Sequence, residues 1–367
     1  MKSITVKSHQ GNYRIVVGRN LLTKAGPLLK GLGLKGKVFV MTQSNLSRPY
    51  GNKIVDSLNR SGLKVYEHFL PSGEEAKSEK ELFRAYHSLL KNGFERRDAV
   101  LALGGGVVGD VAGYTAATFL RGVPFINIGT TLLAQVDSSI GGKTGINLGE
   151  GKNLVGAFYP PKLVISDTEV LKTLPARELQ ASLAEVVKYG VIKDSALFHL
   201  LEKQSEAVLA KNSKLLEKLV LASAKIKAGV VSRDEFETKG ERMILNFGHT
   251  FGHGFEQALN YNYEKLVHGE AVSIGMVCAA RLANRLKLFP VLETHRLISL
   301  LDKLRLPMNL EGLNLKCEKI LSGMMHDKKK KAGKLRFVLP VKIGKVVVRD
   351  NISSDLIKEV IDESLGK

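Results

Sequence analysis

The segment 99–120, AVLALGGGVVGDVAGYTAATFL, carries an apolar run directly into a glycine-rich turn and then into a second ordered stretch. The run 99–103 predicts a buried strand, and the residues after the glycines predict a helix. Gly104, Gly106 and Gly109 fit G-x-G-x-x-G, in which a bare backbone and a helix N-terminus cradle a pyrophosphate. However, at least two strands precede the motif, and no acidic residue about 20 positions further on could hold a ribose. Two interpretations remain: a phosphate-cradling loop of a different dinucleotide fold, or a tight strand–helix turn.

The first half of the chain alternates short β-rich runs with helical stretches. The β-rich runs lie at 37–42, 64–70, 99–103, 125–128 and 163–166, and one helical stretch lies at 78–92. This alternation is typical of a mostly parallel sheet with helices on both faces.

From about Glu178 the pattern becomes mainly helical, because apolar residues recur at i, i+3 and i+4. The segments are 178–232, 268–287 and 292–304, followed by a candidate hairpin over 335–348 and a final helix over about 353–365. A length of 367 residues also fits two domains. We therefore predict an α/β fold, with an N-terminal, Rossmann-like parallel-sheet domain over residues 1–177 and a mainly α-helical domain over residues 178–367.

The charge balance is strongly basic, with 55 Lys and Arg against 36 Asp and Glu and a formal net charge of +19. Nucleic-acid binding, a positive field for a small anionic substrate and a lysine-rich solvated surface would each explain it. The segment 201–227 mixes Glu with Lys, Trp is absent, and no aromatic residues interleave with basic ones. We therefore expect a small anionic substrate and no nucleic-acid partner.

The composition also limits the class of protein. Hydrophobic residues make up 44% and charged residues 25%, which is the balance of a globular chain. We see no apolar run of about 18 residues and expect no membrane partner. The first residues alternate polar and apolar, as a strand does and a signal peptide does not. Cys278 and Cys317 are too few for a disulfide framework, which favours a reducing cytoplasm.

A dense polar stretch covers residues 121–153. Its segment 141–144, GGKT, resembles the end of a P-loop, but Asp137 stands where the complete motif needs a glycine. The stretch is either a binding site or an exposed loop, and flanking apolar residues argue against simple exposure. We expect Lys143, Lys152 and Asn153 to bind an anionic substrate.

Three of the nine histidines lie close together in the sequence. His249 and His253 are spaced i, i+4 and so share one helical face, and His268 opens the next helical segment. Catalytic zinc takes three protein ligands from His and Asp or Glu, so the group favours a metal site, although isolated pairs are more often structural. Glu185 and Lys188 are spaced i, i+3, which by itself favours a surface ion pair.

Taken together, these motifs resemble the 3-dehydroquinate synthases, which are sugar-phosphate cyclases that depend on NAD and zinc. The matching blocks are PSGEEAKS (71–78), LGGGVVGDVAGYTAATFLRG (103–122), GTTLLAQVDSSIGGKTGINL (129–148), KNLVGAFYPP (152–161), LAEVVKYG (183–190), RMILNFGHTFGHGFE (242–256), HGEAV (268–272) and MMHDKKKKAGKLRFVLP (324–340). They follow one another over nearly the whole chain, which is far more specific than any single motif.

The resemblance implies roles for individual residues. The metal ligands would be Glu185, His249 and His268, and His253 would transfer a proton or support the ligands. Contacts with NAD would come from Gly73, Glu74, Lys77, Gly105, Gly106, Val107, Gly109, Asp110, Thr130, Thr131, Lys143, Lys152 and Thr173. Contacts with the substrate would come from Asp137, Lys143, Lys152, Asn153, Lys188, Lys227, Arg242, Asn246 and Lys328 or Lys329. Arg121 would reach the substrate phosphate of the neighbouring subunit, so a homodimer is implied.

The implied enzyme is a cytoplasmic lyase of the shikimate pathway. It would convert 3-deoxy-D-arabino-heptulosonate 7-phosphate to 3-dehydroquinate and phosphate by transient oxidation, phosphate elimination, re-reduction and an intramolecular aldol closure. NAD would show no net turnover, and Zn²⁺, with Co²⁺ as a substitute, would act as a Lewis acid. Two alternatives stay open: another NAD- and metal-dependent sugar-phosphate cyclase, and a metal-dependent polyol dehydrogenase that would consume NAD stoichiometrically.

Overall fold

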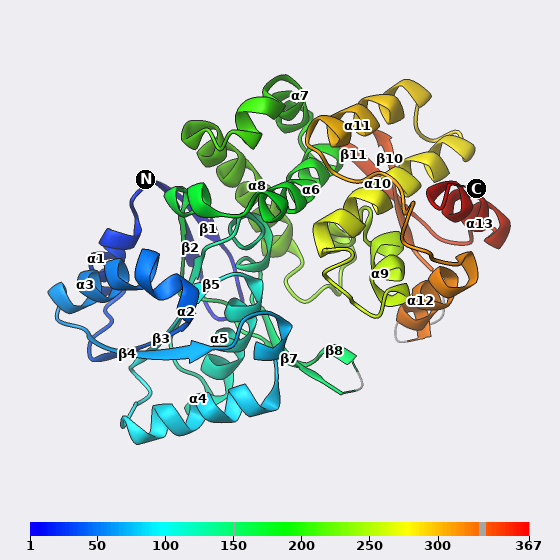
Figure 1. Cartoon of the computed structure of the whole chain (residues 1–367). Coiled ribbons are helices and arrows are strands. Elements are labelled where there is room, and N and C mark those ends of the chain that lie inside the picture. Colours follow the sequence, from blue (N-terminus) through cyan, green and yellow to red (C-terminus); the bar gives the residue numbers. More distant parts are fainter. Residues whose placement is uncertain (150, 330–334, 367) are drawn as a thin grey trace. The chain divides into compact units, whose positions relative to one another are not determined.

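The computed structural model describes residues 1–149, 151–329 and 335–366, without the side chains of residues 326–329. These residues form two compact units (Figure 1). The first unit consists of residues Met1–Leu174 and Ser213–Phe236, and the second of Pro175–Asn212 and Glu237–Lys367.

A seven-stranded sheet forms the first unit, in the order β1-β2-β9-β6-β5-β3-β4. Its strands are β1 (Lys2–Val6), β2 (Tyr13–Gly18), β3 (Lys37–Gln43), β4 (Lys64–Leu70), β5 (Ala99–Gly104), β6 (Phe125–Gly129) and β9 (Leu163–Asp167). Only β1 runs antiparallel to its neighbour, and the other pairs are parallel. The predicted mostly parallel sheet is confirmed, because continuous apolar runs such as β5 are buried on both faces.

Several helices connect these strands. They are α1 (Ala25–Lys30), α2 (Ser44–Leu46), α3 (Asn52–Arg60), α4 (Glu79–Lys91) and α5 (Gly106–Thr118). Ala85 and Leu89 of α4 and Val108 and Val111 of α5 share one hydrophobic cluster with Phe39 of β3. The helix that follows the glycine-rich turn is therefore held firmly against the sheet.

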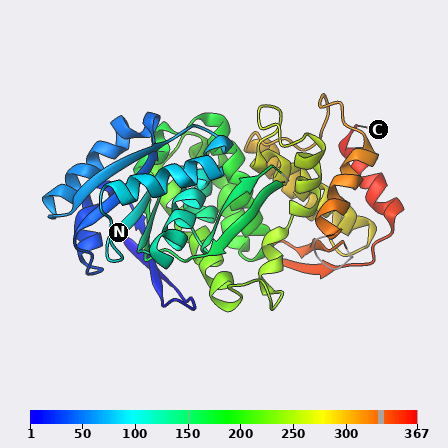
Figure 2. The same ribbon diagram turned by 90° about the horizontal axis from the view of Figure 1, so that it is seen from below.

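Helices dominate the second unit, as predicted. They are α6 (Ala176–Ile192), α7 (Ser195–Leu209), α9 (His249–Ala258), α10 (His268–Arg285), α11 (Val291–Lys303), α12 (Cys317–Lys329) and α13 (Ser354–Ser364). The central α10 contacts α6, α9, α11 and α13. The two-stranded hairpin of β10 (Phe337–Lys342) and β11 (Lys345–Arg349), drawn in red in Figure 2, also belongs to this unit.

The stretch 178–232 is not one continuous helical region. It contains most of α6, then α7, then α8 (Ser213–Arg233), and the side chain of Asp194 accepts the N–H groups of Ala196 and Leu197 at the start of α7. The contacts of α8 with β1 and β2 put it in the first unit. The division therefore differs from the predicted 1–177 and 178–367, since an amphipathic period shows that a face is buried but not which surface covers it.

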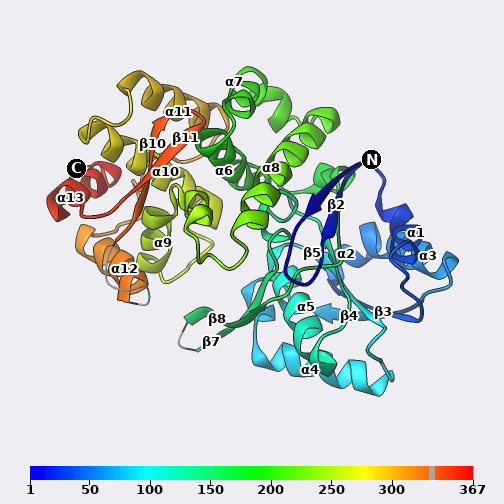
Figure 3. The same ribbon diagram turned by 180° about the vertical axis from the view of Figure 1, so that it is seen from behind.

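The polar stretch around Lys143 is not simply a loop. It forms an antiparallel hairpin of β7 (Lys143–Leu148) and β8 (Gly151–Phe158), which projects from the first unit (Figure 3). Gly145 and Gly156 pair across this hairpin, and a β-carbon at either would crowd the backbone of the other strand. Glycine is rare within strands, so the glycine-containing sequence of residues 143–158 did not predict these two strands.

In the part of the chain that the structure describes, no helix is both long and apolar enough to cross a membrane.

Candidate active site

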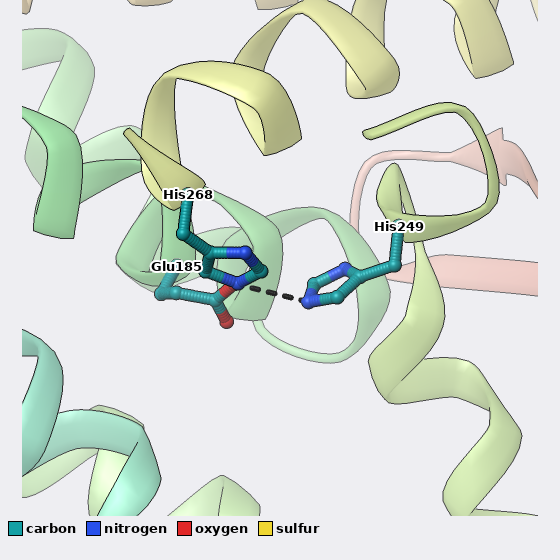
Figure 4. Close-up of side chains that lie close together, drawn as sticks. All are labelled: Glu185, His249 and His268. Atoms are coloured by element: carbon teal, nitrogen blue, oxygen red, sulfur yellow. Dashed lines mark ion pairs between the residues drawn. The ribbon is translucent and has the colours of Figure 1, made fainter. Parts of the chain in front are cut away.

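Three side chains of the second unit bring potential metal-ligand atoms within 4.8 Å of one another: Glu185, His249 and His268 (Figure 4). The carboxylate of Glu185, on α6, is 1% exposed, and its Oε1 lies 3.3 Å from Nε2 of His249 and 3.9 Å from Nε2 of His268. Two imidazole nitrogens and one carboxylate oxygen are a donor set of catalytic zinc sites, which keep a further position open. The residues present therefore fit a zinc-type cation.

The second ring nitrogen of each histidine also has a partner. Nδ1 of His249 lies 3.1 Å from the carbonyl oxygen of Phe247, and Nδ1 of His268 lies 3.2 Å from Oε1 of Glu256. Contacts of this kind fix the ring orientation in metal-binding histidines. They turn both Nε2 atoms toward Glu185.

Close helix packing brings the three ligands together. A β-carbon at Gly269, the residue after His268, would overlap the carbonyl oxygen of Ala181 in α6. A β-carbon at Gly252 in α9 would lie 3.1 Å from the carbonyl oxygen of Ala271 in α10. The backbones of α6, α9 and α10 therefore approach closely because glycine stands at these contacts.

Glu185 and Lys188 do not form a surface pair. Their side chains are 1% and 2% exposed, and Nζ of Lys188 contacts Oε2 of Glu185. A buried charge needs a partner, which each of these groups supplies to the other. The interpretation that their spacing alone favoured is wrong.

Burial and hydrogen bonding act in opposite directions on Glu256 and His268. Burial by itself raises the pKa of Glu256, but its hydrogen bond with His268 and the nearby histidines outweigh this, and the pKa is lowered. Burial by itself lowers the pKa of His268, but the hydrogen bond with Glu256 and the negative charges of Glu256 and Glu185 outweigh this effect, so the pKa is raised. The contact therefore favours a carboxylate opposite a protonated Nδ1.

His253 lies one turn after His249 on α9, with ring centroids 5.4 Å apart. His253 does not belong to the cluster that contains Glu185 and His249. The geometry therefore does not favour the expectation, based on spacing, that His249 and His253 bind one ion. His253, Glu256 and His268 do form a second group whose ligand atoms lie close together.

Two other predicted residues of the second unit lie on the short helix Glu241–Asn246. Arg242 is 5% exposed, and its Nε lies 3.2 Å from Oε1 of Glu237. Asn246, at the end of this helix, is exposed. The predicted contacts Lys328 and Lys329 lie on α12, but their side chains are outside the described part of the structure.

In the first unit, Lys77 connects several of the predicted residues. Its side chain is 5% exposed, and its ammonium group lies 2.8 Å from Oδ2 of Asp110 and also contacts Oδ1 of Asn153. Oε1 of Glu74 lies 3.9 Å from Nζ of Lys77 and 3.8 Å from Nζ of Lys152. Five residues from three segments of the chain thus form one polar network.

The glycine-rich turn opens α5, and the residue that caps this helix is Gly105, which has no side chain to bond the first N–H groups. A β-carbon at Gly105 would lie 3.3 Å from Cγ2 of Thr131, and one at Gly106 would lie 3.0 Å from Oγ of Ser138. The N–H group of Thr130 donates to Gly104. The predicted contacts at Val107 and Gly109 lie in the first turn of the same helix. The turn and the Thr130–Thr131 segment therefore lie side by side at the ends of β5 and β6.

The remaining predicted residues of the first unit are more dispersed. Lys227 on α8 is 7% exposed in its side chain, and its Nζ lies 2.7 Å from both Oδ1 and the carbonyl oxygen of Asp137. Thr173 bonds to Tyr50 through its hydroxyl, and Gly73 has a φ of +76° before the helical turn at Glu74. Arg121 and Lys143 are both exposed.

Two residues of these networks were missing from the prediction. The side chain of Asn147 accepts the N–H of Asn153 and donates to Glu74, each at 2.9 Å. Glu256 follows His249 by seven residues, and this i, i+7 spacing on one helical face is a signal that could have identified it. No comparable signal marks Asn147, because the hairpin was not predicted.

Comparisons with known proteins agree with this arrangement. Family models described as 3-dehydroquinate synthase N-terminal and C-terminal match residues 67–181 and 182–330. The 3-dehydroquinate synthase of Picosynechococcus sp. is 45% identical over 362 residues, which cover 98% of both chains. That of Rippkaea orientalis is 43% identical over 366 residues, which cover 99% of both.

Solved structures with the same fold include two cyclases. The 2-epi-5-epi-valiolone synthase from Streptomyces hygroscopicus, with NAD⁺ and Zn²⁺ bound, has a TM-score of 0.87 and 27% identity, covering 99% of this chain and 98% of that chain. A 2-deoxy-scyllo-inosose synthase complexed with carbaglucose-6-phosphate, NAD⁺ and Co²⁺ has a TM-score of 0.89 and 28% identity, covering 99% and 100%.

The fold and the Glu185–His249–His268 cluster thus place the protein in the class of sugar-phosphate cyclases. The sequence identity to 3-dehydroquinate synthases over nearly the full length of the chain shows the family within this class. The chain belongs to the 3-dehydroquinate synthase family.

Proposed function

We propose that this protein converts 3-deoxy-D-arabino-heptulosonate 7-phosphate to 3-dehydroquinate and inorganic phosphate. The observation that carries the proposal is the convergence of Glu185, His249 and His268 in a chain that is 45% identical to a 3-dehydroquinate synthase over 98% of its length. The conversion breaks one carbon–oxygen bond to phosphate and closes one carbon–carbon bond. It is redox-neutral overall, so a catalytic amount of NAD⁺ is enough.

We also propose that the two units bind different cofactors. The first unit would bind NAD⁺ at its glycine-rich turn, and the second would hold Zn²⁺, or Co²⁺ in its place, through Glu185, His249 and His268. When bound, NAD⁺ would accept and return a hydride, and the cation would act as a Lewis acid toward hydroxyl oxygens. Supporting this assignment, the residue that caps α5 is Gly105, which has no side chain to occupy the N–H groups at the start of this helix.

Cationic side chains would bind the carboxylate and phosphate of the substrate. For this role we propose Lys143, Lys152 and Lys227 of the first unit and Lys188 and Arg242 of the second. Arg242 is 5% exposed and is held by Glu237, so its guanidinium enters the site already oriented. We propose that Asp137, Asn153 and Asn246 orient hydroxyl groups of the same substrate.

We propose His253 as the group that moves a proton at its imidazole. It is exposed, whereas Glu185 is buried, and it stands on the same face of α9 as His249. Histidine is the side chain most often used to transfer protons in catalysis, because an imidazole can both accept and release one.

The test is a phosphate-release assay with the heptulosonate phosphate, catalytic NAD⁺ and Zn²⁺, with and without a chelator. We expect chelator-sensitive release of phosphate, matched one for one by 3-dehydroquinate, with no accumulation of NADH. NADH that accumulates with a polyol would show a dehydrogenase instead. No release of phosphate by protein that binds both NAD⁺ and Zn²⁺ would reject this substrate.

The strongest alternative is another sugar-phosphate cyclase, since two such enzymes share the fold at 27% and 28% identity. Assaying carbocycle formation from a hexose phosphate and from the heptulosonate phosphate side by side separates the two. A glycerol dehydrogenase from Schizosaccharomyces pombe, at 20% identity and a TM-score of 0.68, shares the fold alone.

We further propose a homodimer in which Arg121 reaches the neighbouring site. In its support, Leu120 and Arg121 both have positive φ, 49° and 66°, and such strain in adjacent non-glycine residues is concentrated at functional positions. Light scattering would give the oligomeric state, and mixing R121A with H249A should restore part of the activity only if sites are shared. Cys278 and Cys317 are both free and buried, which supports a reducing cytoplasm as the compartment.

A further inference from the structure

The imidazole of His268 faces a different carboxylate with each of its nitrogens. Nε2 lies 3.9 Å from Oε1 of Glu185, and Nδ1 lies 3.2 Å from Oε1 of Glu256. A carboxylate oxygen accepts hydrogen bonds only, and of these two contacts the one at Nδ1 is within hydrogen-bond distance, so the ring proton of a neutral His268 belongs at Nδ1. The lone pair of Nε2 then points toward Glu185 and His249.

His249 is oriented by a partner of another kind. Its Nδ1 lies beside the backbone carbonyl of Phe247, only two residues earlier in the chain. That carbonyl is present whatever the side chains are. His268 instead relies on a side chain from another helix, 12 residues earlier. A substitution can therefore remove the support of His268 but not that of His249.

Glu256 is placed rigidly enough to orient a ring. It is 5% exposed and lies on α9, whose backbone packs closely against α10 at Gly252. Its own carbonyl oxygen accepts the N–H of Tyr261 at 2.7 Å, which closes the C-terminal end of α9. A buried carboxylate is costly without hydrogen bonds, so its position beside Nδ1 is energetically favoured.

We propose that Glu256 is a positioning residue for the metal site: it holds His268 in the tautomer and orientation that direct Nε2 to the cation. The proposal rests on the proposed function, which assigns Glu185, His249 and His268 as the ligands. It adds that the affinity of the site depends on a fourth side chain, which does not itself bind the ion. Partners of this kind typically change metal affinity by about 10–100-fold.

The experiment compares the full-length wild type with E256A, E256Q, H249A and E264Q. Glu264 is an exposed carboxylate four residues before His268, so E264Q removes the same charge without touching the imidazole. Zn²⁺ affinity is measured by competition with a chromogenic chelator, bound metal per chain by elemental analysis, and ligand geometry by the absorption spectrum of the Co²⁺-loaded protein. Circular dichroism of the metal-free proteins reports folding.

We expect E256A to weaken Zn²⁺ binding by about 10–100-fold and to change the Co²⁺ spectrum, with one ion still bound at saturation. E256Q keeps an oxygen that can accept from Nδ1, so we expect a loss of between about twofold and tenfold. E264Q should stay within about twofold of the wild type, as exposed substitutions do.

Three results would overturn the proposal. The first is an E256A variant with wild-type Zn²⁺ affinity and an unchanged Co²⁺ spectrum. If E256A does not fold, the corresponding result is an E256Q variant whose Zn²⁺ affinity equals that of E264Q. The second is two ions in the wild type and one in E256A, because Glu256 would then be a ligand in the group with His253 and His268. The third is H249A with wild-type affinity, and this result alone would also reject the metal site of the proposed function.

Discussion

Gly275 of α10 lies so close to Gly248 that a β-carbon at position 275 would overlap the carbonyl oxygen of Gly248. Gly248 has a φ of +80° and directly precedes His249, the first residue of α9. Gly275 lies two turns into the helix that His268 opens. This close approach joins the helices that carry two of the proposed metal ligands.

Replacing Gly275 with Ala should destabilise the second unit, because the new methyl group meets backbone that cannot move aside. We expect a cost of about 1–3 kcal/mol and a clear fall in the Tm measured by calorimetry. The matched control is Gly229→Ala in α8, where the nearest atom to a β-carbon is 3.6 Å away on the flexible side chain of Arg233. That change should leave stability equal or higher by about 0.5–1 kcal/mol. Equal effects of the two substitutions would contradict this account of the packing.

Removing one ligand should abolish metal-dependent stabilisation. In the wild type, Zn²⁺ at 100 times its Kd should stabilise the folded state by about 2.7 kcal/mol, because the ion binds the folded form selectively. His249→Ala should show no rise in Tm with Zn²⁺ and no phosphate release, while the metal-free protein keeps its circular dichroism spectrum. A normal Zn²⁺-induced rise in the Tm of this variant would exclude His249 as a ligand.

Lys152→Ala should lower kcat/KM through lost anion binding. Its Nζ lies 3.8 Å from Glu74 in the polar network of the first unit, on the hairpin that also carries Asn153. We expect a loss of about 10–100-fold, which corresponds to one charge-assisted hydrogen bond. Lys345→Ala, on an exposed position of β11, removes the same charge and should leave kcat/KM unchanged. Steady-state kinetics on both variants tests the assignment. Equal losses of kcat/KM in the two variants would show an effect of net charge and not of the position of Lys152.

His68 should make stability depend on pH. Burial, with a smaller effect of Arg84, lowers the pKa of His68 from 6.5 to about 4, and its Nε2 has no hydrogen-bond partner among the described residues. Between these values the unfolded chain binds a proton that the folded chain does not. Stability should therefore fall as the pH drops from 6.5 toward 4, by about 1.4 kcal/mol per pH unit at most.

The check is the free energy of unfolding in urea measured across this pH range. His68→Gln, which cannot titrate, should lose this part of the pH dependence. His295→Gln, at an exposed position, should keep the wild-type slope. If the slopes of wild type and H68Q coincide, His68 is not the group responsible.

Features that depend on local pattern could be predicted from the amino-acid sequence. The glycine-rich turn after β5 needs small residues where Gly105 and Gly106 approach Thr131 and Ser138, and helical periodicity marked the main helices of the second unit. Spacing also placed His249 and His253 on one face of a helix. Such features depend on residues within a few positions of one another, so a linear pattern contains them.

Which of these features come into contact depends on long-range packing. It brought Glu185 of α6 to His249 and His268, buried the ion pair that spacing alone assigned to the surface, and set Glu256 behind His268. It also packed α8 against β1 and β2, and folded a glycine-containing stretch into the hairpin β7–β8. These contacts join residues far apart in the chain, and side-chain packing selects them, which a local hydrophobic period cannot specify.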